Sequence, residues 1–163
     1  MFNWFVCLVR SKVGTIMVHL VYFSNVSENT HRFMERLVSS GVAEGVPVSA
    51  IRLPLKGEQP VIAEDYVLVV PAYGTERNNH IPPQVKKFLA DATTRSHCVG
   101  VVGTGNINFG EEYAVSGDIL SHKLQVPLLW KFELSGFDED ISMMLRICQL
   151  TRESIAELLV DQV

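Results

Sequence analysis

Residues Val18–Phe33, with the sequence VHLVYFSNVSENTHRF, contain the pattern that best predicts the fold of this chain. Its first residues, Val18–Phe23, are apolar or compatible with a strand, and they predict a short buried strand. A polar turn, Ser24–Thr30, separates this strand from a helical pattern of apolar residues. The first N–H groups of a helix have no acceptor within the helix, and the helix dipole favours an anion there. The strand, the hydroxyl-rich turn and the helix together predict a phosphate-binding site.

The composition of this turn restricts the kind of phosphate that it can hold. The turn contains no lysine, so it is not the loop that clamps a nucleoside triphosphate. It also lacks the spaced glycines along which a dinucleotide pyrophosphate lies. A single monophosphate is therefore the expected ligand. The alternative reading of the turn alone is that Ser27 only caps the helix.

The overall composition excludes several classes of protein. The chain has 163 residues, of which 47% are hydrophobic and 20% charged, with a net charge of −4. These values predict one folded domain and give no support to a nucleic-acid-binding role. The cysteines, Cys7, Cys98 and Cys148, lie far apart in the sequence, which favours free thiols over disulfides. No apolar run is long enough to span a membrane, and the histidines show no metal-ligand spacing. We therefore expect a cytoplasmic protein without a metal site.

The first segment, Met1–Ile16, stands apart from the rest. It is apolar at its start and basic near Arg10 and Lys12, which is the reverse of the charge order of a signal peptide. Two explanations stay open. Met17 directly precedes the first strand, so the start codon of this sequence could be assigned too far upstream; otherwise the segment is an arm that packs on the sheet or on a partner. We expect residues 1–16 to be an extension and residues 17–163 to form the folded domain.

The rest of the chain alternates between strands and helices. Further strands are predicted at Pro47–Leu53, Tyr66–Val70, Cys98–Val102 and Leu128–Phe132. Helices are predicted from the first turn to an end at Gly41 and Gly45, from Pro83, over Glu111–Lys123, and from Asp138 onwards. Near-continuous apolar strands that alternate with helices indicate an α/β fold, in which helices cover both faces of an open parallel sheet. Apolar spacing predicts the buried side chains of the first helix (Phe33, Leu37 and Val38) and of a continuous last helix (Ile141, Leu145, Cys148, Ile155 and Leu158).

Two further loops follow strands of the predicted sheet. They are Pro71–Pro83 (PAYGTERNNHIPP) and Gly103–Gly110 (GTGNINFG). Ligands of open α/β sheets bind outside the carboxyl ends of the strands, so these loops and Ser24–Thr30 are expected to converge on one site. Tyr73 and Phe109 could enclose a flat heteroaromatic ring, which suggests FMN when a single phosphate is attached. The alternative for Tyr73 alone is that it packs on the edge of the sheet.

Four motifs give the sequence a specific resemblance. They are the segments Val21–Ser24 with Ser27–Thr30, Pro71–Gly74, Gly105–Gly110 (GNINFG) and Phe132–Gly136 (FELSG). Together they resemble the NrdI family, the flavodoxin-like proteins of class Ib ribonucleotide reductase systems. The resemblance runs from about Met17 to the last helix. Ordinary flavodoxins resemble the first loop only partly, because they usually carry glycine where this chain has Glu28.

The resemblance implies a fold, a cofactor and a function. The fold would be a flavodoxin-like three-layer sandwich, with a five-stranded parallel sheet of order 2-1-3-4-5. The cofactor would be FMN, and the flavin rather than a catalytic side chain would carry the chemistry. Reduced members of the family react with O2 while docked on the small, radical-bearing subunit of the reductase. The superoxide or peroxide formed oxidises the dimanganese site of that subunit and yields its tyrosyl radical. A flavin or thiol reductase would be the electron donor.

By the same resemblance, the candidate cofactor-binding residues come from the three loops. They are Ser24, Asn25, Val26, Ser27, Asn29 and Thr30 for the phosphate, Ala72, Tyr73, Gly74 and Thr75 for one side of the ring, and Gly105, Asn106, Asn108, Phe109 and Gly110 for the other.

The chain departs from the family pattern in two places. Asn25 stands where the family often has a second serine, which keeps a polar side chain. Thr75 and Glu76 stand where relatives commonly have glycines, and this should restrict a peptide flip towards the reduced flavin. If Glu76 lies near the ring, its charge would lower the reduction potential of the flavin. These departures leave two alternatives to the activator: a general flavodoxin-type electron carrier, and a binding module that has lost its flavin.

Overall fold

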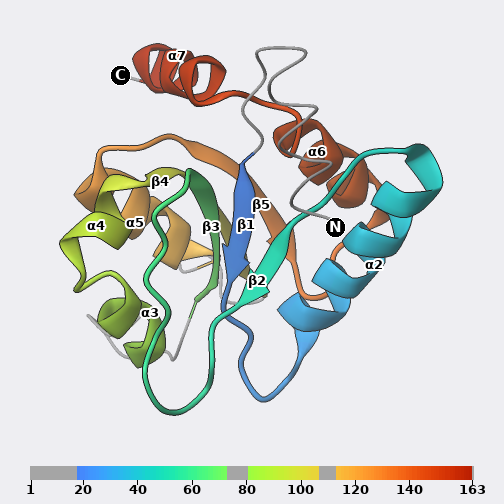
Figure 1. Ribbon diagram of the computed structural model, residues 1–163. Coiled ribbons are helices and arrows are strands. Elements are labelled where there is room, and N and C mark those ends of the chain that lie inside the picture. Colours follow the sequence, from blue (N-terminus) through green and yellow to red (C-terminus); the bar gives the residue numbers. More distant parts are fainter. Residues whose placement is uncertain (1–17, 73–80, 107–112, 163) are drawn as a thin grey trace.

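The computed structural model describes residues 18–72, 81–106 and 113–162. Five parallel strands form one sheet, in the order β2-β1-β3-β4-β5. The strands are β1 (His19–Tyr22), β2 (Ala50–Arg52), β3 (Tyr66–Pro71), β4 (Cys98–Gly105) and β5 (Leu128–Glu133). The predicted α/β fold and the strand order 2-1-3-4-5 are therefore confirmed (Figure 1).

Helices cover both faces of this sheet. The helices α2 (Asn29–Glu44) and α6 (Asp138–Ile147) lie on one face (Figure 1). The opposite face carries α3 (Pro83–Phe88), α4 (Ala92–Ser96) and α5 (Val115–Leu124). The helix α7 (Arg152–Gln162) lies at the edge of the sheet where the strands begin (Figure 1). Among the described residues, the turns that precede α2 and α6 lie at the opposite edge, where the strands end.

The central strand β3 shows how the sheet divides the core in two. All six of its residues are buried. Val67 and Val69 belong to the cluster under α2 and α6, whereas Tyr66, Leu68 and Val70 belong to the cluster under α3 and α5. Side chains alternate between the faces of a strand, so burial on both faces requires an unbroken apolar run.

The strand β4 extends beyond its predicted end. It continues to Gly105, so the first three residues of the predicted loop Gly103–Gly110 belong to the strand. The glycines have a packing role here, because a Cβ atom on Gly103 would lie 2.8 Å from the carbonyl oxygen of Ala114. A Cβ atom on Gly105 would lie 2.7 Å from the backbone nitrogen of Ala114. The small residues let the start of α5 approach the strand.

The first helix differs from its prediction in its buried face and at Gly41, which lies within it. The helix α2 ends at Glu44, and the predicted end residue Gly45 caps it with a φ of 72°, the left-handed conformation typical of a helix C-terminus. Phe33 and Leu37 are buried as predicted, but Val38 is 37% exposed. Met34 lies in the core in its place, because it is one helical turn away from Leu37 and shares the inner face with it.

The last predicted helix is two helices, and a short additional helix precedes β4. Between α6 and α7, Thr151 accepts a hydrogen bond from the N–H of Ser154 through its hydroxyl at 3.1 Å, which caps a new helix. Ile155 is buried, but Leu158 is exposed, so the predicted apolar stripe is interrupted. The additional helix α4 is capped by Asp91, which accepts a hydrogen bond from the N–H of Thr94 at 2.8 Å.

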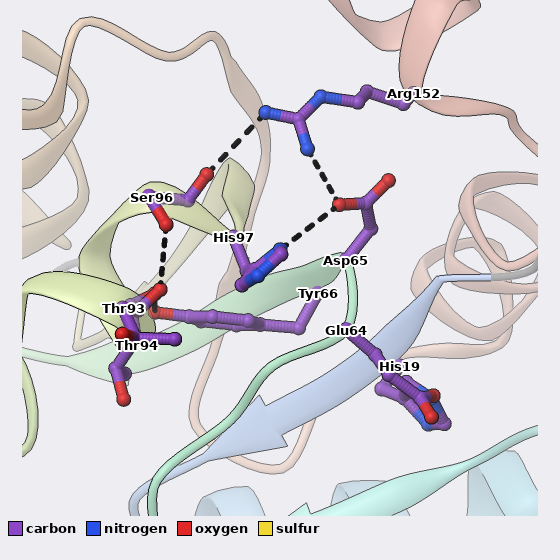
Figure 2. A network of polar contacts seen from close by, with 9 residues as sticks. All are labelled: His19, Glu64, Asp65, Tyr66, Thr93, Thr94, Ser96, His97 and Arg152. Carbon is purple, nitrogen blue, oxygen red and sulfur yellow. Dashed lines mark hydrogen bonds and ion pairs between the residues drawn. The ribbon is translucent and has the colours of Figure 1, made fainter.

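A polar network holds α7 at the edge where the strands begin, as Figure 2 shows. The carboxylate of Asp65 lies 2.6 Å from a guanidinium nitrogen of Arg152 and 3.6 Å from Nδ1 of His97. Arg152 also donates a hydrogen bond to the carbonyl of Ser96 at 3.3 Å. Tyr66, at the start of β3, donates its hydroxyl hydrogen to the carbonyl of Thr94 at 2.9 Å. The network therefore ties α7 to the starts of β3 and β4.

Candidate functional site

A pocket lies at the edge where the strands end. Its volume is about 200 Å³. It is formed by the β1–α2 turn, the ends of β3 and β4, and the turn after β5. The lining residues are Asn25, Ser27, Asn29, Thr30, Pro71, Ala72, Thr104, Gly105, Asn106 and Leu134. The described parts of the three predicted loops therefore meet at one site.

Hydrogen bonds shape the β1–α2 turn. The hydroxyl of Ser24 is buried and accepts a hydrogen bond from the N–H of His31 at 3.0 Å. The carbonyl of Glu28 accepts from the N–H of Arg32 at 2.9 Å. Asn29 and Thr30 lie between Glu28 and His31, and their N–H groups have no acceptor within the described part of the chain. Ser24, and not Ser27, thus satisfies an amide of the helix, and two amides stay available to a ligand.

Residues of the turn alternate between the pocket and its outer side. Asn25, Ser27 and Asn29 line the pocket. The N–H and the hydroxyl of Ser27 both donate to Oδ1 of Asn25, at 3.1 and 2.5 Å, which fixes their relative position. Val26 does not line the pocket, and its side chain is 93% exposed.

Glu28 has an unusual backbone conformation. Its φ of 61° places it in the left-handed region, where glycine is favoured because it has no Cβ atom. Its carboxylate lies 2.5 Å from a guanidinium nitrogen of Arg52. The hydrogen bond from Arg52 lowers the pKa of the Glu28 carboxyl below its usual value. Nearby, the hydroxyl of Tyr22 lies 2.8 Å from Nδ1 of His31, and burial raises the pKa of this tyrosine.

Polar contacts join the ends of neighbouring strands to the turn. Thr30, in the first turn of α2, has its hydroxyl 3.3 Å from that of Thr104 in β4, and both residues are buried. The N–H of Ala72 donates to the carbonyl of Thr104 at 2.9 Å, which continues the pairing of β3 with β4. The pocket floor therefore links the ends of two strands to the start of a helix.

The turn after β5 contributes an apolar side chain. Leu134 has a φ of 51°, which is rare for a residue of its size, and its N–H donates to the carbonyl of Gly105 at 2.8 Å. Its side chain is 44% exposed and lines the pocket. Gly136, with a φ of 72°, closes the same turn, and a Cβ atom there would lie 2.4 Å from the ring of Phe33. Phe33 in turn stacks on Phe132, with ring centroids 3.9 Å apart.

The donors of the pocket fit a phosphate ester. Residues with hydroxyl and side-chain amide groups line it, and two of them, Asn29 and Thr30, have backbone N–H groups without an acceptor in the described part of the chain. None of the described lining residues is lysine or arginine. Neutral donors at a helix start stabilise an anion through hydrogen bonds and the helix dipole. The volume is below the roughly 300–1,000 Å³ of pockets that enclose a whole small molecule. This volume suits the phosphate end of a ligand. The residues predicted to contact the ring, together with Glu76, lie outside the described residues: Tyr73, Gly74, Thr75, Glu76, Asn108, Phe109 and Gly110.

Three of the pocket residues were not among the predicted ones. Pro71 and Thr104 are the last paired residues of β3 and β4 along their common edge. Thr104 lies in the predicted loop Gly103–Gly110, which was expected to contribute to the site, but the structure places this residue in β4. Leu134 belongs to the FELSG motif, but its left-handed backbone and its place at the pocket had no signal in the sequence.

Two negative findings apply to residues 18–72, 81–106 and 113–162. None of their helices has the length and apolarity needed to cross a bilayer. Their His, Cys, Asp and Glu side chains form no group of three or more that could hold a metal ion.

Comparison with known proteins identifies sequence relatives. The sequence model of a family described as "NrdI Flavodoxin like" matches residues 21–146. A protein from Yersinia pseudotuberculosis named "Protein NrdI" is 46% identical over 76% of this chain and 87% of its own length. A protein of the same name from Beutenbergia cavernae is 48% identical over 77% of this chain and 86% of its own length. Another, from Mycoplasmopsis pulmonis, is 42% identical over 85% of this chain and 88% of its own length.

Solved structures resemble the chain in fold. A short-chain flavodoxin associated with a bacterial microcompartment has a TM-score of 0.58 at 17% identity, and covers 88% of this chain and 99% of its own. Oxidised flavodoxin 2 from Bacillus cereus has a TM-score of 0.53 at 15% identity, over 90% and 99%. Two-electron reduced Megasphaera elsdenii flavodoxin has a TM-score of 0.52 at 19% identity, over 86% and 99%.

Proposed function

This chain belongs to the NrdI flavodoxin-like family, and on that premise we propose that it is an FMN-binding redox protein that activates class Ib ribonucleotide reductase. A flavin is the cofactor that both the family and the fold imply. The observation that supports FMN in particular is the pocket of neutral donors at the start of α2, which suits one phosphate monoester. FAD and nicotinamide dinucleotides carry a pyrophosphate, for which the turn offers neither glycines nor a basic side chain.

Each part of the pocket has a role in this proposal. The N–H groups of Asn29 and Thr30 bind the phosphate oxygens, and the side chains of Asn25 and Ser27 add polar contacts. Leu134 covers one side of the pocket and keeps water from the bound ligand. We assign residues 17–163 to this flavin-binding domain.

The chemistry belongs to the cofactor. When bound and reduced, FMN supplies electrons to O2, and the resulting superoxide or peroxide would serve to oxidise the dimanganese site of the small reductase subunit. The protein positions the flavin and controls access to it. We place the reaction in the cytoplasm, with a flavin or thiol reductase as the electron donor.

The small subunit is proposed to dock at the edge where the strands end. Val26 lies in the β1–α2 turn between two pocket residues, and Phe137 lies three residues after the pocket residue Leu134. Both side chains are among the most exposed large apolar ones of the described residues. Exposed apolar side chains around a site are typical of a surface that binds another protein.

The experiment that tests the proposal is anaerobic photoreduction of the purified protein, followed by addition of O2. The visible spectrum reports the flavin, and electron paramagnetic resonance reports the tyrosyl radical of the manganese-loaded small subunit. We expect the radical to form only when the reduced protein and the subunit are together. Free reduced FMN at the same concentration is the control.

Two outcomes would contradict the proposal in different ways. A flavin-containing protein that forms no radical, but passes electrons to several reductases, would be a general electron carrier. A colourless protein that cannot be reconstituted with FMN would be a binding module without a flavin.

A further inference from the structure

Glu28 is the last residue of the β1–α2 turn, directly before α2, and it does not line the pocket. Its neighbours Ser27 and Asn29 line the pocket, whereas Glu28 and its partner Arg52 do not. We propose that the Glu28–Arg52 ion pair is a brace that holds this turn in its phosphate-binding conformation. Both are positioning residues in this view. The inference rests on the proposed function, because it concerns the phosphate end of the same site.

The backbone of Glu28 explains why a brace is needed. A residue with a side chain is strained at a φ of 61°, because its Cβ atom comes too close to the following carbonyl oxygen. The turn nevertheless depends on this conformation. The N–H of Glu28 donates to the carbonyl of Asn25 at 3.0 Å, and its carbonyl accepts from Arg32 at 2.9 Å. If Glu28 relaxed, both bonds and the positions of the amides of Asn29 and Thr30 would change.

Arg52 is well placed to hold Glu28. It is the last residue of β2 and is paired with Tyr22 at the end of β1, the strand that leads into the turn. The N–H of Leu53 donates to the carbonyl of Tyr22 at 2.8 Å, so the pairing extends past Arg52. The ion pair thus connects the far end of the turn to the strand pair from which the turn departs. Its two side chains are partly buried, which limits screening by solvent.

The pair also affects the charge near the phosphate. Glu28 adjoins the two helix amides that the proposal gives to the phosphate, and a free carboxylate would repel that anion. Arg52 offsets this charge. Loss of Arg52 alone should therefore weaken phosphate binding in two ways, through the strained backbone and through the unpaired carboxylate.

The test compares FMN with riboflavin, which has the same ring and no phosphate. Dissociation constants of both flavins are measured by flavin fluorescence for the parent and for Arg52→Met, with the melting temperature of each protein. We expect Arg52→Met to bind FMN roughly five- to tenfold more weakly, with riboflavin binding unchanged. Arg52→Lys, which keeps the charge, should lose less affinity for FMN.

A second substitution tests the backbone directly. Glycine adopts the left-handed conformation without strain and carries no charge. Glu28→Gly in the Arg52→Met background should therefore restore much of the lost affinity for FMN. Arg152→Met is the matched control, because it removes a partly exposed ion pair with Asp65 at the opposite edge of the sheet (Figure 2). It should change neither dissociation constant.

The possible results separate this inference from the proposed function. If the parent does not bind FMN, the proposed function fails. If the parent binds FMN and Arg52→Met binds it equally well, the brace is refuted. An equal loss of riboflavin affinity would refute it as well, because the effect would then not be confined to the phosphate end. Failure of Glu28→Gly to restore binding would contradict the assigned role of the backbone.

Discussion

The hydroxyl oxygens of Thr30 and Thr104 lie 3.3 Å apart inside the protein, although the two residues are 74 positions apart in the sequence. One belongs to the first turn of α2 and the other to the end of β4. This contact connects the phosphate-side turn to the strand that precedes the third predicted loop. Because both hydroxyls are buried, removal of one leaves the other without a partner.

The threonine pair gives the first prediction. Thr104→Val should lower the free energy of unfolding by about 1–2 kcal/mol, because the hydroxyl of Thr30 loses its partner. The double variant Thr30→Val/Thr104→Val should lose less than the sum of the single variants, since neither hydroxyl is then left unpaired. Urea denaturation of the four proteins without flavin measures the coupling. Strictly additive losses would show that the two hydroxyls do not interact.

Gly136 should tolerate no side chain. Gly136→Ala adds a Cβ atom 2.4 Å from the ring of Phe33 at a φ of 72°, so we expect a loss of about 2–4 kcal/mol of unfolding free energy. Gly45 has the same φ of 72°, but nothing lies within 4 Å of the position that a Cβ atom would take, so Gly45→Ala should lose only about 1 kcal/mol. Thermal and urea unfolding measure both. Equal losses would mean that the aromatic contact does not restrict Gly136.

Val26 should matter to a protein partner and not to the flavin. Its side chain is 93% exposed and does not line the pocket. Val26→Glu should therefore leave FMN affinity unchanged while it weakens binding to the small reductase subunit roughly tenfold. Val42→Glu is the matched control, because Val42 is 81% exposed near the other end of α2. Surface plasmon resonance on the subunit measures both variants, and equal effects would contradict docking at the pocket edge.

Asp91 should contribute stability that disappears in acid. The hydrogen bonds from Thr94 lower the pKa of its carboxyl below the usual value near 4. A carboxyl with a lowered native pKa stabilises the fold above its unfolded pKa, and this contribution is lost as the pH falls through the native pKa. The stability gap between the parent and Asp91→Ala should therefore be constant near pH 7 and shrink below about pH 4.

Asp91→Asn is the control for this titration. Asparagine caps helices about as well as aspartate and does not ionise, so this variant should keep a gap over Asp91→Ala that is independent of pH. Urea midpoints between about pH 3 and about pH 7 provide the measurement. A gap between the parent and Asp91→Ala that stays constant down to about pH 3 would show that the charged form of Asp91 does not carry the cap.

The sequence predicted the sheet because burial leaves a strong signal. Tyr66–Val70 is apolar throughout, and a strand with helices on both faces has no polar position. The turn at Ser24–Thr30 was also predicted correctly as the junction between a strand and a helix, since polar and helix-capping residues interrupt the apolar pattern there. The order of the strands was predicted from the resemblance to the NrdI family, because apolar periodicity alone does not indicate which strands are neighbours in the sheet.

Other features depend on contacts that a local pattern does not contain. Gly103 and Gly105 were interpreted as loop residues, but they are small because α5 packs closely on β4. Leu134 has a left-handed backbone that is fixed by its hydrogen bond to Gly105, and leucine gives no hint of this conformation. The break between α6 and α7 did have a signal, because Thr151 is a typical capping residue within the apolar stripe.

The attachment of α7 has a practical consequence for experiments with this protein. The helix is fastened through Arg152 to Asp65 at the edge where the strands begin (Figures 1 and 2). The pocket opens at the other edge of the sheet. A tag, a fluorescent label or a solid support joined to the end of α7 would leave the pocket turned towards the solution. On an electrode or a sensor chip, immobilised molecules would then share one orientation, with the site accessible to soluble ligands.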